Sequence, residues 1–96
     1  MPEWRSAEHL ARHFRDHHRR LRLRSVAAYD ASARETIAVG TYFEYRDLDS
    51  GDPRVGYYDR ETGRFTALTS DESTILTHYG CSESYVANSL LGSTYA

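Results

Sequence analysis

The chain has 96 residues, a formal net charge of −2, 40% hydrophobic residues and a single cysteine. This length and composition predict one globular domain with one modest core. One cysteine excludes an internal disulfide, no apolar run approaches the roughly 20 residues of a membrane span, and the charged N-terminus does not resemble a signal peptide. We therefore expect a cytoplasmic protein without a membrane partner.

Positive charge is concentrated in the first quarter of the chain. Residues 1–24 contain seven arginines against three acidic residues, whereas residues 25–96 contain five arginines against eleven acidic residues. The two segments therefore carry +4 and −6, and lysine is absent from both. A basic segment on an acidic body can hold phosphates, and arginine suits bidentate phosphate contact.

Two helices are predicted before the first strand. Residues 3–22 follow Pro2 and repeat apolar side chains at three- and four-residue spacing, which is typical of one amphipathic helix. Ser25 is a suitable N-cap for a second helix over residues 26–37, and Gly40 is expected to end it.

Four of the five histidines lie in the first predicted helix. His17 falls at the margin of the apolar stripe, which is a good position for a tuned imidazole, although a solvated helix edge is the alternative. His9, His13 and His17 also share the i, i+4 spacing that binds metals on some helices. Three such residues in line span too much helix for one tetrahedral site, and no HExxH-like carboxylate accompanies them. We therefore expect neither a metal nor a cofactor.

The apolar period changes from helical to two residues after Gly40. Strands are predicted over residues 41–46, 54–59, 64–68 and 74–79, and their short polar connections predict an antiparallel meander. The sequence thus predicts an α+β fold in which two N-terminal helices pack on a four-stranded antiparallel sheet. Residues 83–91 are expected to form a short C-terminal helix, and residues 92–96 a loose tail.

The last predicted strand carries the side chains of greatest chemical interest. Strict alternation places Ile75, Thr77 and Tyr79 on one face of the sheet and Leu76 and His78 on the other. One face therefore presents a hydroxyl and a phenol two residues apart.

Four motifs follow one another along the chain: His13-Phe14-x-x-His17, Ser25…Tyr29…Ala33, Gly56-Tyr57-Tyr58-Asp59-x-x-Thr62-Gly63-x-Phe65 and Ile75-x-Thr77-x-Tyr79. In this order they resemble the C-terminal nuclease domains of bacterial polymorphic and contact-dependent toxins, which have the barnase/EndoU/colicin/RelE-type ribonuclease fold. The resemblance covers residues 10–79 and implies helices packed on a four-stranded antiparallel sheet.

The resemblance also implies a function. It implies a metal-independent ribonuclease toxin that cleaves RNA, often tRNA, in the producing or the target cell, and a cognate immunity or antitoxin protein. Carried over by position, the catalytic residues are His17, Arg46, Thr77 and Tyr79. The substrate-binding residues are His13, Arg24 and Arg54. His13 is the second choice for the helical histidine, and Arg24, Arg54 and Arg64 are alternatives to Arg46.

Cleavage through the ribose 2′-OH needs a base, an acid and a cation beside the phosphate. Histidine, arginine, threonine and tyrosine side chains can supply these groups if they converge. We expect His17, Arg46, Thr77 and Tyr79 to line one cleft between the first helix and the sheet. Two alternatives remain open: a catalytically idle module that binds RNA or protein on this scaffold, and a structural or regulatory partner protein whose histidine-rich helix is only a surface.

Overall fold

The computed structural model describes residues 2–91 and has the α+β architecture expected from the sequence. Its elements in chain order are β1 (Glu3–Trp4), α1 (Ala7–Leu21), α2 (Val26–Val39), β2 (Thr41–Arg46), β3 (Pro53–Asp59), β4 (Arg64–Thr69), β5 (Thr74–Gly80), α3 (Glu83–Tyr85) and the π-helical segment η1 (Val86–Leu91). The predicted tail over residues 92–96 lies outside the described residues. No helix in the described part of the chain is long and apolar enough to cross a membrane.

The sheet has five strands in the order β1-β5-β4-β3-β2. The four longer strands are antiparallel neighbours, as predicted, but β1 pairs in parallel with β5 through Glu3 opposite Thr74 and Trp4 opposite Ile75. The prediction of a four-stranded, wholly antiparallel sheet is therefore wrong, because the sheet is mixed.

The first helix begins later than predicted. Ser6, rather than a residue beside Pro2, is the N-cap of α1, and its Oγ accepts a hydrogen bond of 3.0 Å from the backbone N–H of His9. Trp4 fits the apolar spacing of the helix, which explains the error, but in the structure it is a buried strand residue whose indole N–H donates to Asp30 at 2.8 Å.

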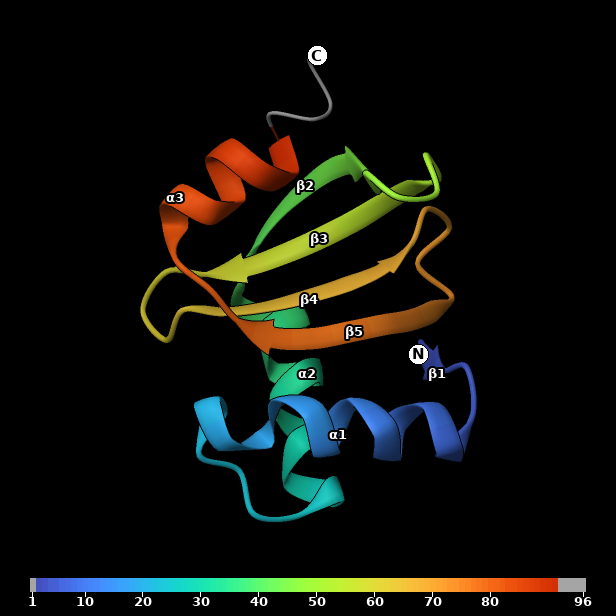
Figure 1. Cartoon of the computed structure of the whole chain (residues 1–96), viewed down its shortest axis with the longest axis vertical. Coiled ribbons are helices and arrows are strands. Elements are labelled where there is room, and N and C mark those ends of the chain that lie inside the picture. The colour runs from blue at the N-terminus through green and yellow to red at the C-terminus, as the bar shows by residue number, and fades with distance from the viewer. Residues whose placement is uncertain (1, 92–96) are drawn as a thin grey trace.

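The helices occupy different positions around the sheet. Figure 1 shows α1 running beside β5 while α2 passes behind the sheet, where it packs on β3 and β4. The C-terminal helical segment lies over the opposite face and contacts β2. Each face consequently has its own apolar cluster. The cluster on the α2 side comprises Trp4, Leu21, Tyr29, Ala33, Leu68 and Ile75, and the other comprises Tyr45, Tyr58, Phe65, Ala67 and Val86.

A bulge in β5 changes the predicted alternation. Thr77 is opposite Ala67 and Ile75 is opposite Leu68, so Leu76 has no partner of its own on β4. Ile75 therefore joins the cluster on the α2 side, contrary to the prediction that it shares a face with Thr77.

His78 points toward α2 and is fully buried. Its Nε2 lies 2.8 Å from the Ser32 hydroxyl, and its Nδ1 lies 2.8 Å from the Thr66 hydroxyl and 3.0 Å from the Phe65 carbonyl oxygen. Burial lowers the pKa of His78 to about 4, so the ring is neutral and joins the sheet to α2.

Candidate active site

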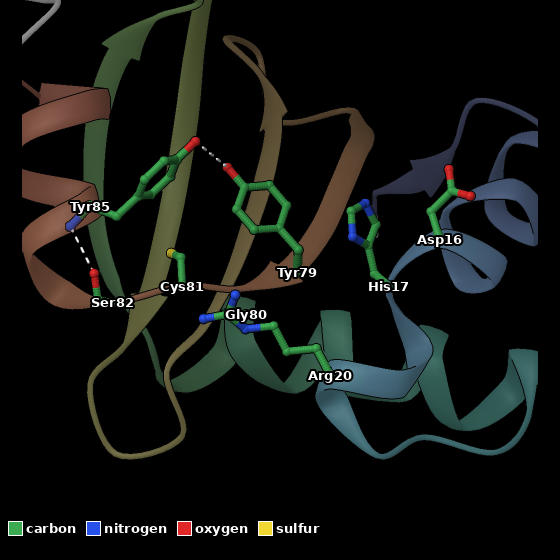
Figure 2. Close-up of a pocket in the computed structure, with 8 residues that line it drawn as sticks. All are labelled: Asp16, His17, Arg20, Tyr79, Gly80, Cys81, Ser82 and Tyr85. Carbon is green, nitrogen blue, oxygen red and sulfur yellow. Dashed lines mark hydrogen bonds between the residues drawn. The ribbon is translucent and has the colours of Figure 1, made fainter.

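An open cleft lies where the C-terminal half of α1, the end of β5 and the start of α3 meet (Figure 2). Its volume is about 600 Å³, which is within the usual range of small-ligand sites. The residues that line it are Asp16, His17, Arg20, Tyr79, Gly80, Cys81, Ser82 and Tyr85.

His17 and Tyr79 lie side by side in the lining of this cleft, with a ring-centroid distance of 5.6 Å (Figure 2). Burial lowers the pKa of the half-buried His17, and the nearby Asp16 carboxylate acts in the opposite direction. Burial, followed by a hydrogen bond with the Tyr85 hydroxyl, raises the pKa of Tyr79. Both side chains are therefore neutral at pH 7, which leaves the imidazole able to accept a proton and the phenol able to donate one.

Arg20 supplies the cation of the cleft. Figure 2 shows its side chain extending toward Gly80, and a Cβ atom added to Gly80 would lie 3.2 Å from the Arg20 Nε. The missing side chain of Gly80 thus leaves room for the guanidinium at the end of β5. The sequence prediction omits Arg20, although its position three residues after His17 places it on the same side of the helix.

Tyr85 and Ser82 come from the C-terminal helical segment and are absent from the sequence prediction. The Tyr85 hydroxyl lies 3.5 Å from that of Tyr79, and the Ser82 hydroxyl accepts the backbone N–H of Tyr85 at 3.1 Å (Figure 2). No spacing signal marks these two residues, because their position depends on how the C-terminal segment packs against the sheet.

Thr77 and His13 form a pair beside the cleft. Thr77 Oγ1 lies 3.0 Å from His13 Nδ1, and neither residue lines the cleft itself. Burial, with the neighbouring His9 and His17, lowers the pKa of His13 to about 4. His9 lies one turn earlier, and its Nε2 is 2.8 Å from the Leu76 carbonyl oxygen. The three histidines therefore pack α1 along the outer edge of β5.

The predicted cleft with Arg46 is wrong in geometry. β3 and β4 separate β2 from β5, so Arg46 lies at the far side of the sheet. There it lines a different pocket together with Arg54 and donates a hydrogen bond of 2.9 Å to the Gly51 carbonyl oxygen. Arg54 forms a 3.2 Å ion pair with Asp47. Strand order, which alternation alone does not specify, accounts for the error.

The remaining candidate arginines also lie apart from the cleft lining. Arg24 is exposed in the connection between α1 and α2. Arg64 donates to the Ser32 hydroxyl at 2.9 Å and to the Leu21 carbonyl oxygen at 3.1 Å. Its guanidinium therefore ties β4 to both helices, which is a structural role.

Across residues 2–91, no three histidine, cysteine or acidic side chains are grouped so that they could hold a metal ion. His9 and His13 each have a ring nitrogen hydrogen-bonded to β5, which limits their use as ligands.

Comparisons with family models, with curated proteins and with solved structures gave no match to the chain.

Proposed function

We propose that the protein is a metal-independent ribonuclease that cleaves RNA through the ribose 2′-OH. The observation that carries the proposal is the meeting of a neutral imidazole, a guanidinium and two phenols in one open cleft. Phosphodiester cleavage by this route needs those groups and no metal.

The proton transfers assign His17 and Tyr79 to opposite roles. A ring nitrogen of His17 takes the proton of the 2′-OH while the 2′-oxygen attacks phosphorus. The bond from phosphorus to the 5′-oxygen breaks, and the Tyr79 phenol gives its proton to that oxygen. The products are a 2′,3′-cyclic phosphate and a 5′-hydroxyl. Proton exchange through water then returns both side chains to their neutral forms.

Arg20 binds the phosphate in this proposal. Its exposed guanidinium can donate two parallel hydrogen bonds to the non-bridging oxygens, where negative charge accumulates during the reaction. The Ser82 and Tyr85 hydroxyls offer further donors, and the partly exposed Tyr85 ring is available to stack on a base.

The assignment as a bacterial toxin rests on the resemblance described above, which also implies a cognate immunity protein. Such an inhibitor would be acidic where it meets the basic first helix, because potentials across interfaces of this kind tend to be complementary. By covering α1 and Tyr79 together it would close the cleft.

The test uses a pool of short RNAs that contains every dinucleotide step, incubated with the purified protein in EDTA. We expect cleavage in EDTA with cyclic phosphate ends, and no cleavage where the sugar 5′ to the scissile phosphate is 2′-deoxy. Products with 5′-phosphate ends, or activity that returns only with added metal, would exclude the mechanism. Binding without cleavage would favour the idle RNA-binding module.

A further inference from the structure

The solvent side of α1 carries three arginines in line. Arg12, Arg15 and Arg19 recur at three- and four-residue spacing and thus lie on one side of the helix, and all three are exposed. At 1.5 Å per residue they span about 10 Å along the helix axis. We call these three residues the arginine row.

The charge of the arginine row is largely available to an external anion. The Arg15 side chain is 74% exposed and lies 3.7 Å from the Asp16 carboxylate, an exposed pair of the kind that contributes little free energy. Neither Arg12 nor Arg19 has a side-chain hydrogen bond or an ion pair with another residue of the described part of the chain.

The arginine row lies about a quarter-turn around α1 from Arg20, because successive residues of a helix are about 100° apart. Arg19 directly precedes Arg20, whose side chain lines the cleft beside His17. A strand that lies along the row could therefore present successive phosphates to its arginines and continue around the helix to Arg20.

We propose that the arginine row binds the backbone of a base-paired RNA stem next to the unpaired nucleotide that is cleaved, so that the preferred substrate is a hairpin. This inference rests on the proposed function. A cleft of about 600 Å³ accepts an unpaired nucleotide but not a duplex. An exposed basic ridge outside it can contact the phosphates of a stem without reading its sequence.

When no inhibitor is bound, RNA suits the arginine row better than a further protein partner does. The centre of a protein interface is normally apolar and aromatic. The exposed large apolar side chains in the described residues are Val26, Val39, Tyr42, Leu48 and Tyr85, and none of them lies on α1. The surface around the row is thus a charged one without an apolar centre.

The experiment compares a hairpin with a linear RNA that has the same unpaired sequence. The double variant Arg12→Gln/Arg19→Gln removes two charges from the row, and Arg46→Gln/Arg60→Gln removes two exposed charges elsewhere. We expect the row variant to have a higher KM for the hairpin. The slope of log binding constant against log salt concentration should become shallower by roughly 0.9 for each arginine removed. The variant's kcat, and its kcat/KM on linear RNA, should stay unchanged.

Binding of a hairpin with a 2′-deoxy sugar at the scissile step separates this inference from the proposed function. If the protein binds the hairpin preferentially, this binding depends on the row, and ordinary RNA is not cleaved, then the role of the row is supported and the ribonuclease proposal is overturned. Three outcomes would overturn the proposed role of the arginine row and leave the ribonuclease proposal intact. The row variant could cleave ordinary RNA with equal losses of kcat/KM on both RNAs, or with no loss. The control variant could also lose as much kcat/KM as the row variant. If the true partner of the row is an acidic protein, the row variant should have the wild-type KM and kcat for the hairpin, which would also overturn the proposed role of the row.

Discussion

Burial acts on His17 and Tyr79 in opposite directions because their charged forms differ. The imidazole is charged when protonated, so burial lowers its pKa, whereas the phenol is charged when deprotonated, so burial raises its pKa. The same half-buried environment therefore keeps both side chains neutral at pH 7, as the proposed mechanism requires of a base and a proton donor.

Asp16 offers a direct test of the role of His17. If His17 is the base, kcat/KM should rise with pH through a midpoint below 6.5, because the pKa of His17 is lowered from that value. Asp16→Asn removes the carboxylate that raises the pKa of His17, so the midpoint should move to lower pH. The pH profile is measured on a short RNA. A midpoint that moves upward in Asp16→Asn would contradict this assignment.

His78 should make stability depend on pH. Its pKa is about 4 in the folded protein against 6.5 for an unperturbed histidine, so between these values the unfolded chain binds a proton that the folded protein does not. The free energy of unfolding should therefore fall as pH falls through this window, by up to about 3 kcal/mol from this residue. Denaturant titrations should show a flatter pH dependence for His78→Gln. An equally steep dependence in that variant would assign the effect to other groups, such as His13.

At the scale of elements, close packing of neighbouring strands leaves no room for a side chain at Gly56. A Cβ atom there would lie 2.6 Å from Phe43 Cζ and 2.7 Å from Phe65 Cε1. Gly56→Ala should therefore overpack this face and lower the free energy of unfolding by roughly 1–3 kcal/mol.

Chemical denaturation tests the Gly56→Ala prediction, with Gly51→Ala for comparison. Gly51 has a φ of +76° and no atom within 4 Å of an added Cβ, so only backbone strain opposes its substitution. If Gly56→Ala has the wild-type free energy of unfolding, the Phe43 and Phe65 rings move aside at no cost and the prediction is wrong.

The elements that sequence predicts well are those with local signals. The change of period after Gly40 marks β2 to β5 to within one residue of their observed bounds, and Ser25 marks the start of α2. The parallel pairing of β1 and the bulge at Leu76 depend on contacts between distant segments, which no local pattern encodes.

The candidate site divides in the same way. Helical phase places His17 at the margin of the apolar stripe of α1, and alternation places Tyr79 on an accessible face of the sheet. Both residues consequently line the cleft. Arg46 is wrongly included because strand order decides its distance from β5. Tyr85 is missed because its position depends on the packing of the C-terminal segment against the sheet.

At the scale of the whole molecule, charge and shape are arranged around one junction. The basic segment over residues 1–24 meets the acidic remainder of the chain where α1 lies beside β5, and the cleft is at this junction. A polyanion would be attracted to α1 and repelled by the rest of the surface, which would orient it before contact. Salt should therefore weaken RNA binding steeply.

The most direct test of the ribonuclease proposal compares His17→Ala with His18→Ala. His18 is the adjacent histidine of α1, but its Nδ1 lies 3.2 Å from the Leu23 carbonyl oxygen and its ring stacks on Phe14, away from the cleft. Both variants are first shown to be folded, and their cleavage rates are then measured on one RNA in EDTA. We expect His17→Ala to lose about 10²-fold or more, as is usual for a general base, and His18→Ala to cleave at nearly the wild-type rate. Wild-type cleavage by folded His17→Ala would contradict the account.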